Sequence, residues 1–171
     1  MSSRVIEIIT SSFTKLLIPG LVYTIPITLI SFAIGLLIAI VTALIRVKKI
    51  KVLSQIIQFY VWIFRGTPLL VQLFIIYYGL PSVGIVLEAF PAAIITFSLN
   101  VGAILSVDKR QLEACYSVGM TYFQSMYHII LPQALKIAIP PLFNSLIALV
   151  KDTSLAANIT VAEMFMAAQR I

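Results

Sequence analysis

A run of 30 consecutive residues without a charge, from Leu16 to Ile45, constrains this chain more than any other feature of its sequence. As an α-helix the run would reach about 45 Å, whereas the hydrocarbon core of a bilayer is about 30 Å thick. The composition agrees, because 61% of the residues are hydrophobic and only 11% are charged, against about 45–50% and about 25% in soluble proteins. The sequence therefore predicts an all-α, polytopic membrane protein.

A cleaved signal peptide is the alternative explanation of this run. Its hydrophobic region has only about 7–15 residues and is followed by a small-residue cleavage site. The run here is longer, and the basic stretch RVKKIK at 46–51 follows it, which is typical of a stop-transfer signal. We therefore expect a retained transmembrane helix. Because Lys and Arg gather in cytoplasmic loops, this helix should end in the cytoplasm and the N-terminus should lie outside.

Three further apolar stretches predict three more spans. The second covers 52–80 and is interrupted by Arg65-Gly66-Thr67-Pro68, and Pro81 and Gly84 mark a turn on the outer side after it. The third covers 90–107 and leads to the charged cluster Asp108-Lys109-Arg110, which favours the cytoplasm. The fourth covers 134–150 and is interrupted by Lys136 and by Pro140-Pro141. The predicted topology is multi-pass, with 113–132 on the cytoplasmic side.

Several classes of function receive no support from the residues. The net charge of +6 fits positive cytoplasmic loops and does not call for a nucleic acid partner. His128 is the only histidine and has no companions at metal-ligand spacing. The sequence has no phosphate-binding loop and no nucleophile–base arrangement, so we expect no cofactor, no catalytic residue and no metal. The single Cys115 excludes an internal disulfide.

The segment EACYSVGMTYFQSMYHIILP at 113–132 is amphipathic in an otherwise apolar chain. Residues 111–118 can form two helical turns that end at Gly119. Thr121 and Gln124 have the spacing of a capping box for a second helix. One face of that helix is apolar and carries Phe123, Met126, Tyr127 and Ile130. This pattern suits a docking helix, an interfacial helix on the lipid or a folded-back loop, and periodicity alone leaves these open.

The order of residues in this segment carries more information than its periodicity. Glu113-Ala114-Cys115, three residues, Gly119, nine residues and then Ile129-Ile130-Leu131-Pro132 resembles the EAA loop of permease subunits in bacterial ABC importers, E-A-A-x3-G-x9-I-x-L-P. Cys115 replaces the second alanine. The resemblance implies a coupling helix that sits in a cleft of a cytoplasmic ATPase subunit. It assigns ATPase coupling to Glu113, Ala114, Cys115, Gly119, Leu131 and Pro132, although Glu113 could also lie on a solvated helix face.

Two further stretches look like the polar amino acid uptake subgroup of these permeases. They are FRGTPLLVQLFIIYYGLP at 64–81 and LPQALKIAIPPLFNSLIALVKDTSL at 131–155. The resemblance implies a helical bundle of the type I importer kind in a bacterial cell membrane, with lipid around it. It also implies a permease that is not itself an enzyme. Its partners would be a separate ATPase, a second permease subunit, identical or homologous, and an extracytoplasmic amino acid-binding protein.

The polar residues of the second span allow two interpretations. Thr67 before Pro68 has the pattern of an N-cap, so a helix could restart at Pro68 and offer its positive end to a carboxylate. Alternatively, Arg65 extends to the cytoplasmic headgroups while Gly66 and Pro68 only kink a continuous helix. Thr67 and Gln72, polar on an otherwise apolar span, are predicted to lie on the substrate path.

The cluster Lys151-Asp152-Thr153-Ser154 follows the fourth apolar stretch directly. Ionisable residues between apolar segments are by default candidates for a functional site. A zwitterionic amino acid could place its carboxylate at Lys151 and its ammonium at Asp152, with the hydroxyls of Thr153 and Ser154 completing the site. In the subgroup that the chain resembles, this segment lines the transmembrane cavity. An ordinary extracellular turn is the alternative.

Two departures from the family pattern stand out. Ala103 joins directly to Ile104-Leu105-Ser106-Val107, where the family has a stretch of the type Y-x-x-E-x-x-R-G in between, so about ten residues, or roughly 15 Å of helix, are missing. We expect the third helix to be shortened at its cytoplasmic end. The family also has a further helix after the V-x-E-M-F region, so 1–171 is interpreted as a single, incomplete permease domain that contains the coupling loop at 108–132.

The sequence thus predicts the permease subunit of an ATP-driven importer for polar amino acids. Two other classes remain open: a secondary transporter or channel that uses Arg65, Lys151 and Asp152 without ATP, and a membrane scaffold that transports nothing.

Overall fold

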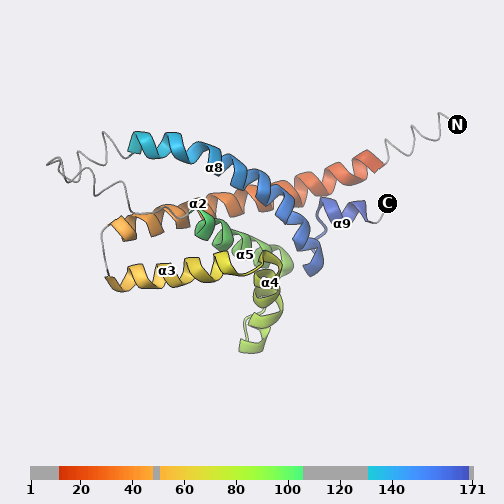
Figure 1. The fold of residues 1–171 in the computed structure, drawn as a ribbon. Helices are drawn as coiled ribbons and strands as arrows, with labels where there is room; N and C mark the ends of the chain where they lie inside the picture. The colour runs from red at the N-terminus through yellow and green to blue at the C-terminus, as the bar shows by residue number, and fades with distance from the viewer. Residues whose placement is uncertain (1–11, 48–50, 106–130, 170–171) are drawn as a thin grey trace.

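The computed structural model describes residues 12–47, 51–105 and 131–169, and every regular element in these ranges is a helix. The prediction of an all-α chain is thereby confirmed for the described residues. A helix at 12–19 continues through a π-helical turn into α2, and the remaining elements follow as Figure 1 shows. Their bounds are η1 Gly20–Thr24, α2 Ile25–Val47, α3 Lys51–Gly66, α4 Leu69–Phe74, η2 Ile75–Gly79, η3 Leu80–Val83, α5 Ala89–Ile104, α8 Leu131–Asp152, η5 Thr153–Ile159 and α9 Met164–Ala168.

The first helix has the length that the charge-free run predicts. Ser12–Ile45 forms 34 continuous helical residues of high hydropathy, long enough to cross a membrane. The second stretch passes the same test only as a bent pair, Val52–Gly66 with Leu69–Val83, whose axes differ by 110°. By length and composition the described residues therefore contain one such span, or two if the bent pair counts as one. The helix Ala89–Ile104 is apolar but shorter.

The π-helical turn η1 has a local cause. Pro26 lacks the N–H that would bond the carbonyl four residues earlier, and Ile25 instead donates its backbone N–H to the Gly20 carbonyl, one residue further back than in an α-helix. The turn also receives the end of the described chain. The backbone N–H of Met164 donates to the Thr24 hydroxyl over 3.3 Å, and the short helix α9 packs on η1.

α5 is the central element of the fold. It contacts α2, α3, α4, α8 and η5, and in Figure 1 it lies between α2 and α3. Most of its side chains are buried, and Phe97 at its centre is fully enclosed. The core around it also includes residues of α2, α4, α8 and η5, namely Ile27, Leu73, Leu149 and Ile159. Residues that line a site on α5 are therefore held by the whole bundle.

Small residues let α2 and α5 approach closely. A Cβ on Gly35 would lie 2.7 Å from a methyl of Val101, and a Cβ on Gly102 would lie 2.7 Å from a methyl of Ile38. These contacts also fix the register of the two helices. Beyond Ile38, α2 continues nine residues to Val47, whereas α5 ends two residues beyond Gly102. The difference corresponds to about 10 Å of helix.

The fourth predicted stretch forms one helix, α8, from Leu131 to Asp152. The expected interruption at Pro140-Pro141 is wrong, because the helix runs through both prolines. Each proline removes one backbone donor but leaves the neighbouring turns intact. After α8 the chain turns through η5, and Thr160 closes it with a left-handed φ of 66°. Glu163, 1% exposed, then caps α9 by accepting from the backbone N–H groups of Phe165 and Met166.

Candidate functional site

The predicted second span is broken rather than kinked. α3 ends at Gly66 and α4 begins at Leu69, so the prediction of a restarted helix holds and that of a continuous helix is wrong. The prediction that Thr67 caps the new helix is also wrong. Pro68 occupies the N-cap position with an extended backbone. The Thr67 hydroxyl instead donates to the Ile63 carbonyl of the preceding turn over 2.8 Å, a bond open to it because α3 is still helical there.

Gln72 closes the break with its side-chain amide. Its Nε2 group lies 2.9 Å from the Phe64 carbonyl, 3.0 Å from the Thr67 carbonyl and 2.8 Å from the Thr67 hydroxyl. Its Oε1 accepts a hydrogen bond of 3.0 Å from Nδ2 of Asn100 on α5. Gln72 is buried, and its bonds supply partners to backbone carbonyls that the helical ladder no longer satisfies. The break is therefore a defined structure held by side chains.

Arg65 lies at the same place, and its guanidinium reaches the C-terminal end of α5. Nε donates to the Ala103 carbonyl over 3.0 Å and Nη2 donates to the Ile104 carbonyl over 2.8 Å. A cation at these carbonyls also complements the negative end of the helix dipole. These two bonds tie α3 to α5.

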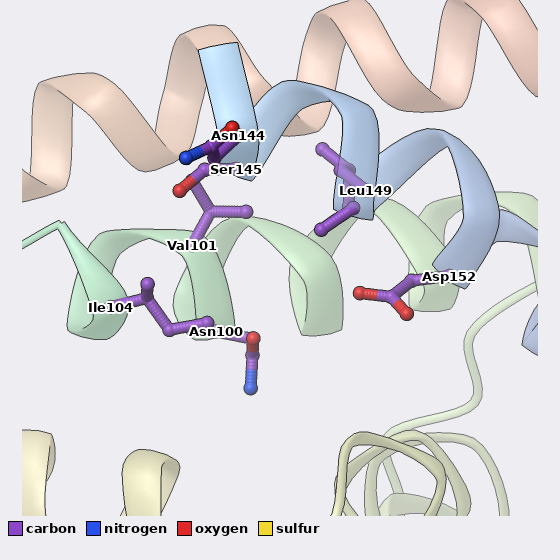
Figure 2. Close-up of a pocket in the computed structure, with 8 residues that line it drawn as sticks. Asn100, Val101, Ile104, Asn144, Ser145, Leu149 and Asp152 are labelled. Carbon is purple, nitrogen blue, oxygen red and sulfur yellow. The ribbon is translucent and has the colours of Figure 1, made fainter. Parts of the chain in front are cut away.

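A cavity of about 260 Å³ opens between α5 and α8. Figure 2 shows its lining side chains on the two facing helices, with the Asp152 carboxylate pointing into the space between them. Four of the lining residues are polar, namely Asn100, Asn144, Ser145 and Asp152. The other four are apolar, namely Val101, Ile104, Ala148 and Leu149. Such a mixture, apolar walls with a few polar groups, is typical of small-molecule sites.

Asp152 gives the cavity its charge. The side chain is partly buried, and within the described ranges of the chain no cation pairs with it. A carboxylate next to apolar walls gains from an incoming cation, because the environment solvates its charge poorly. The cavity can therefore accept a positively charged group at Asp152 and hydrogen-bonding groups at Asn144 and Ser145.

The other residues of the predicted KDTS cluster lie elsewhere. Lys151 is exposed and does not line the cavity. Thr153 is buried, and its hydroxyl donates to the Val150 carbonyl over 2.6 Å. Ser154 is partly buried. Thr67 and Gln72 do not line the cavity either, but Gln72 bonds to Asn100, which does.

Sequence reasoning missed Asn100, Asn144 and Ser145 as lining residues. A signal for part of this set was present, because Asn144, Ala148 and Asp152 are spaced four residues apart and so share one face of a helix. For Asn100 the sequence shows only a polar residue in an apolar stretch. That it pairs with Gln72 can be seen only in the folded chain.

The residues predicted to couple to an ATPase are described only in part. Glu113, Ala114, Cys115 and Gly119 lie outside the described residues, and so does the predicted helix–turn–helix that contains them. Leu131 and Pro132 form the first residues of α8.

Comparison with known proteins gives consistent matches. The family model described as binding-protein-dependent transport system inner membrane component matches residues 35–171. The L-cystine transport system permease protein TcyB of Bacillus subtilis (strain 168) is 49% identical over 174 residues, covering 96% of this chain and 74% of that protein. The probable amino-acid permease protein YxeN of the same bacterium is 47% identical over 163 residues, covering 86% and 73%.

A solved structure is also similar. The crystal structure of an amino acid ABC transporter with histidines has a chain that matches with a TM-score of 0.81 and 34% identity, covering 95% of this chain and 80% of that one. The alignment with TcyB, at 174 residues, is longer than this chain of 171 residues. It must therefore contain positions of the relative that have no counterpart in this chain.

Proposed function

Because the chain belongs to the family of binding-protein-dependent transport system inner membrane components, we propose that it carries polar amino acids across a bacterial membrane through the cavity at Asp152. The chain is a permease subunit of an ABC importer for amino acids, and a separate subunit hydrolyses the ATP. An ATPase and a substrate-binding protein are its general partners. What we propose beyond this is the route of the substrate and the residues that line it.

The cavity carries this proposal. Its volume of about 260 Å³ lies just below the range of about 300–1,000 Å³ for drug-sized ligands, so it suits a small solute. The Asp152 carboxylate would pair with the ammonium of the substrate, and the amides of Asn100 and Asn144 would bond its polar groups. The apolar side chains of Val101 and Leu149 would contact its carbon atoms. The relatives named for L-cystine and amino-acid transport support this class of substrate.

The remaining predicted path residues take supporting positions in this proposal. Lys151, exposed at the end of α8, would meet the substrate carboxylate, and a second permease subunit, identical or homologous, would help to enclose the path. Thr153 and Ser154 would shape the turn that presents Lys151 and Asp152. Thr67 and Gln72 would act through Asn100 rather than touch the substrate.

Coupling to ATP is proposed for the segment 108–132 within the single permease domain. The match of Glu113-Ala114-Cys115 and Gly119 to the EAA motif supports it, with Leu131 and Pro132 joining the segment to α8. A short helix held in a cleft by its apolar face can pass a movement of the ATPase to the bundle. The proposal places this loop in the cytoplasm and the N-terminus outside, since the basic residues at 46–51 and 108–110 then share one side.

Uptake of labelled amino acids tests the role of the cavity. The complex of this chain with the ATPase and binding protein of its bacterium is reconstituted in liposomes, and uptake is compared with that of Asp152→Asn. We expect the variant to lower uptake by about tenfold to a hundredfold, as for the loss of one charged hydrogen bond. Glu88→Gln makes the same chemical change at an exposed residue and should leave uptake unchanged. Equal uptake by wild type and Asp152→Asn would contradict the proposed path.

A further inference from the structure

Arg65 holds the last turn of α5 through two nitrogens of one planar group. Nε donates to the Ala103 carbonyl over 3.0 Å, and Nη2 donates to the Ile104 carbonyl over 2.8 Å. Two parallel bonds fix both the position and the orientation of the turn, which a single ammonium could not do. A cation in an apolar span is costly and marks a functional site by default.

The turn that Arg65 holds belongs to the wall of the cavity. Asn100, Val101 and Ile104, all in the last five residues of α5, line the space that Asp152 faces. A shift of this turn would change the shape of the cavity directly. The chain continues from Ile104 to the EAA-like motif, which begins nine residues later at Glu113.

Arg65 itself lies in the last turn of α3, directly before the break between α3 and α4. The carbonyls of the break, at Phe64 and Thr67, are bonded by the Gln72 amide. A Cβ on Gly66 would meet no atom within 4 Å, so the break has open space beside it. Side-chain bonds of this kind can be rearranged without unwinding a helix, and hinges are commonly a few residues at element ends.

We propose that Arg65 is a positioning residue that joins the C-terminal turn of α5 to the break in the second span, so that a movement of the coupling segment reaches the cavity. This inference rests on the proposed function. In this role Arg65 neither binds the substrate nor anchors the chain to the membrane. The bonds to Ala103 and Ile104 make the α5 end and the break move as one unit.

The test measures uptake per ATP hydrolysed in liposomes that contain the assembled complex. Arg65→Gln keeps a polar side chain but removes the charge and the two-nitrogen geometry. We expect ATP hydrolysis to persist while uptake per ATP falls roughly fivefold to tenfold, near the low end of coupling between linked sites. Arg65→Lys keeps the charge and should give an intermediate ratio. Gln58→Ala, an exposed residue on the same helix, is the matched control and should equal wild type.

An unchanged ratio in Arg65→Gln would overturn the inference, even if less complex were assembled, because a purely structural role lowers uptake and hydrolysis together. Should Arg65→Gln fail to assemble, Arg65→Lys carries the same test, and a wild-type ratio in it would count against the inference. Absence of ATP-driven uptake by the wild-type complex would instead contradict the proposed function.

Discussion

Asn100 on α5 and Gln72 on α4 are joined by a hydrogen bond of 3.0 Å between Nδ2 of Asn100 and Oε1 of Gln72. The two side chains are buried, and Gln72 lies just after the bend of 110° that separates α4 from α3. One member of the pair lines the cavity and the other closes the break in the second span. The pair thus connects the cavity to the break in the second span.

Replacement of Gln72 by Leu should destabilise the fold. The change removes the Gln72 amide from the Phe64 and Thr67 carbonyls and from Asn100. Asn100 Nδ2 then keeps only its long bond of 3.5 Å to the Phe64 carbonyl. We expect the free energy of unfolding to fall by about 1–2 kcal/mol, since buried polar groups that lose a partner cost about this much. The measurement is thermal unfolding of the purified chain in detergent.

Gln58→Leu serves as the comparison, because Gln58 is exposed on α3 and should change the stability by no more than about 0.5 kcal/mol. Equal melting of the Gln72 and Gln58 variants would show that the network around Gln72 contributes nothing to stability.

Gly102→Ala should disturb the contact between α2 and α5. The new Cβ would lie 2.7 Å and 2.9 Å from two atoms of Ile38 and 3.1 Å from the Tyr60 hydroxyl. Overpacking of this kind costs about 1–3 kcal/mol of unfolding free energy, and the same thermal unfolding assay detects it.

Two further variants make this prediction specific. Gly66→Ala adds a Cβ where no atom lies within 4 Å, so it should not destabilise the chain. Ile38→Ala removes the nearest obstructing atom, so the double variant with Gly102→Ala should recover part of the loss. Loss of stability in Gly66→Ala equal to that in Gly102→Ala would mean that the close approach is not the cause.

The sequence was sufficient to locate the helices, because local signals determine them. The charge-free run ending at Ile45 lies in a helix that ends at Val47, and the apolar stretch at 90–107 corresponds to α5, Ala89–Ile104. Gly66 and Pro68 correctly marked the break in the second span. In each case the preference of a few neighbouring residues agrees with the final structure.

The direction of α4 and the composition of the cavity could not be predicted in this way. The bend of 110° brings α4 into contact with α5, and the partner of Gln72 is Asn100, 28 residues further along the chain. The cavity combines residues of α5 and α8 that are at least 40 positions apart. Likewise, Thr67 had the sequence pattern of an N-cap, but its hydroxyl bonds back to Ile63 instead. The Gln72–Asn100 pair and the cavity depend on packing between distant segments, whereas Thr67 chose between two local partners.

ATP-driven uptake by the Gly119→Asp variant tests most directly whether this permease works through a coupling helix. Gly119 occupies the glycine position of the EAA-like motif, and an aspartate there would disfavour the left-handed helix end and add a charge to the predicted docking segment. We predict that the variant inserts in the membrane at wild-type levels but has lost ATP-driven uptake, with Gly119→Ala in between. Uptake by Gly119→Asp at the wild-type rate would contradict the coupling role.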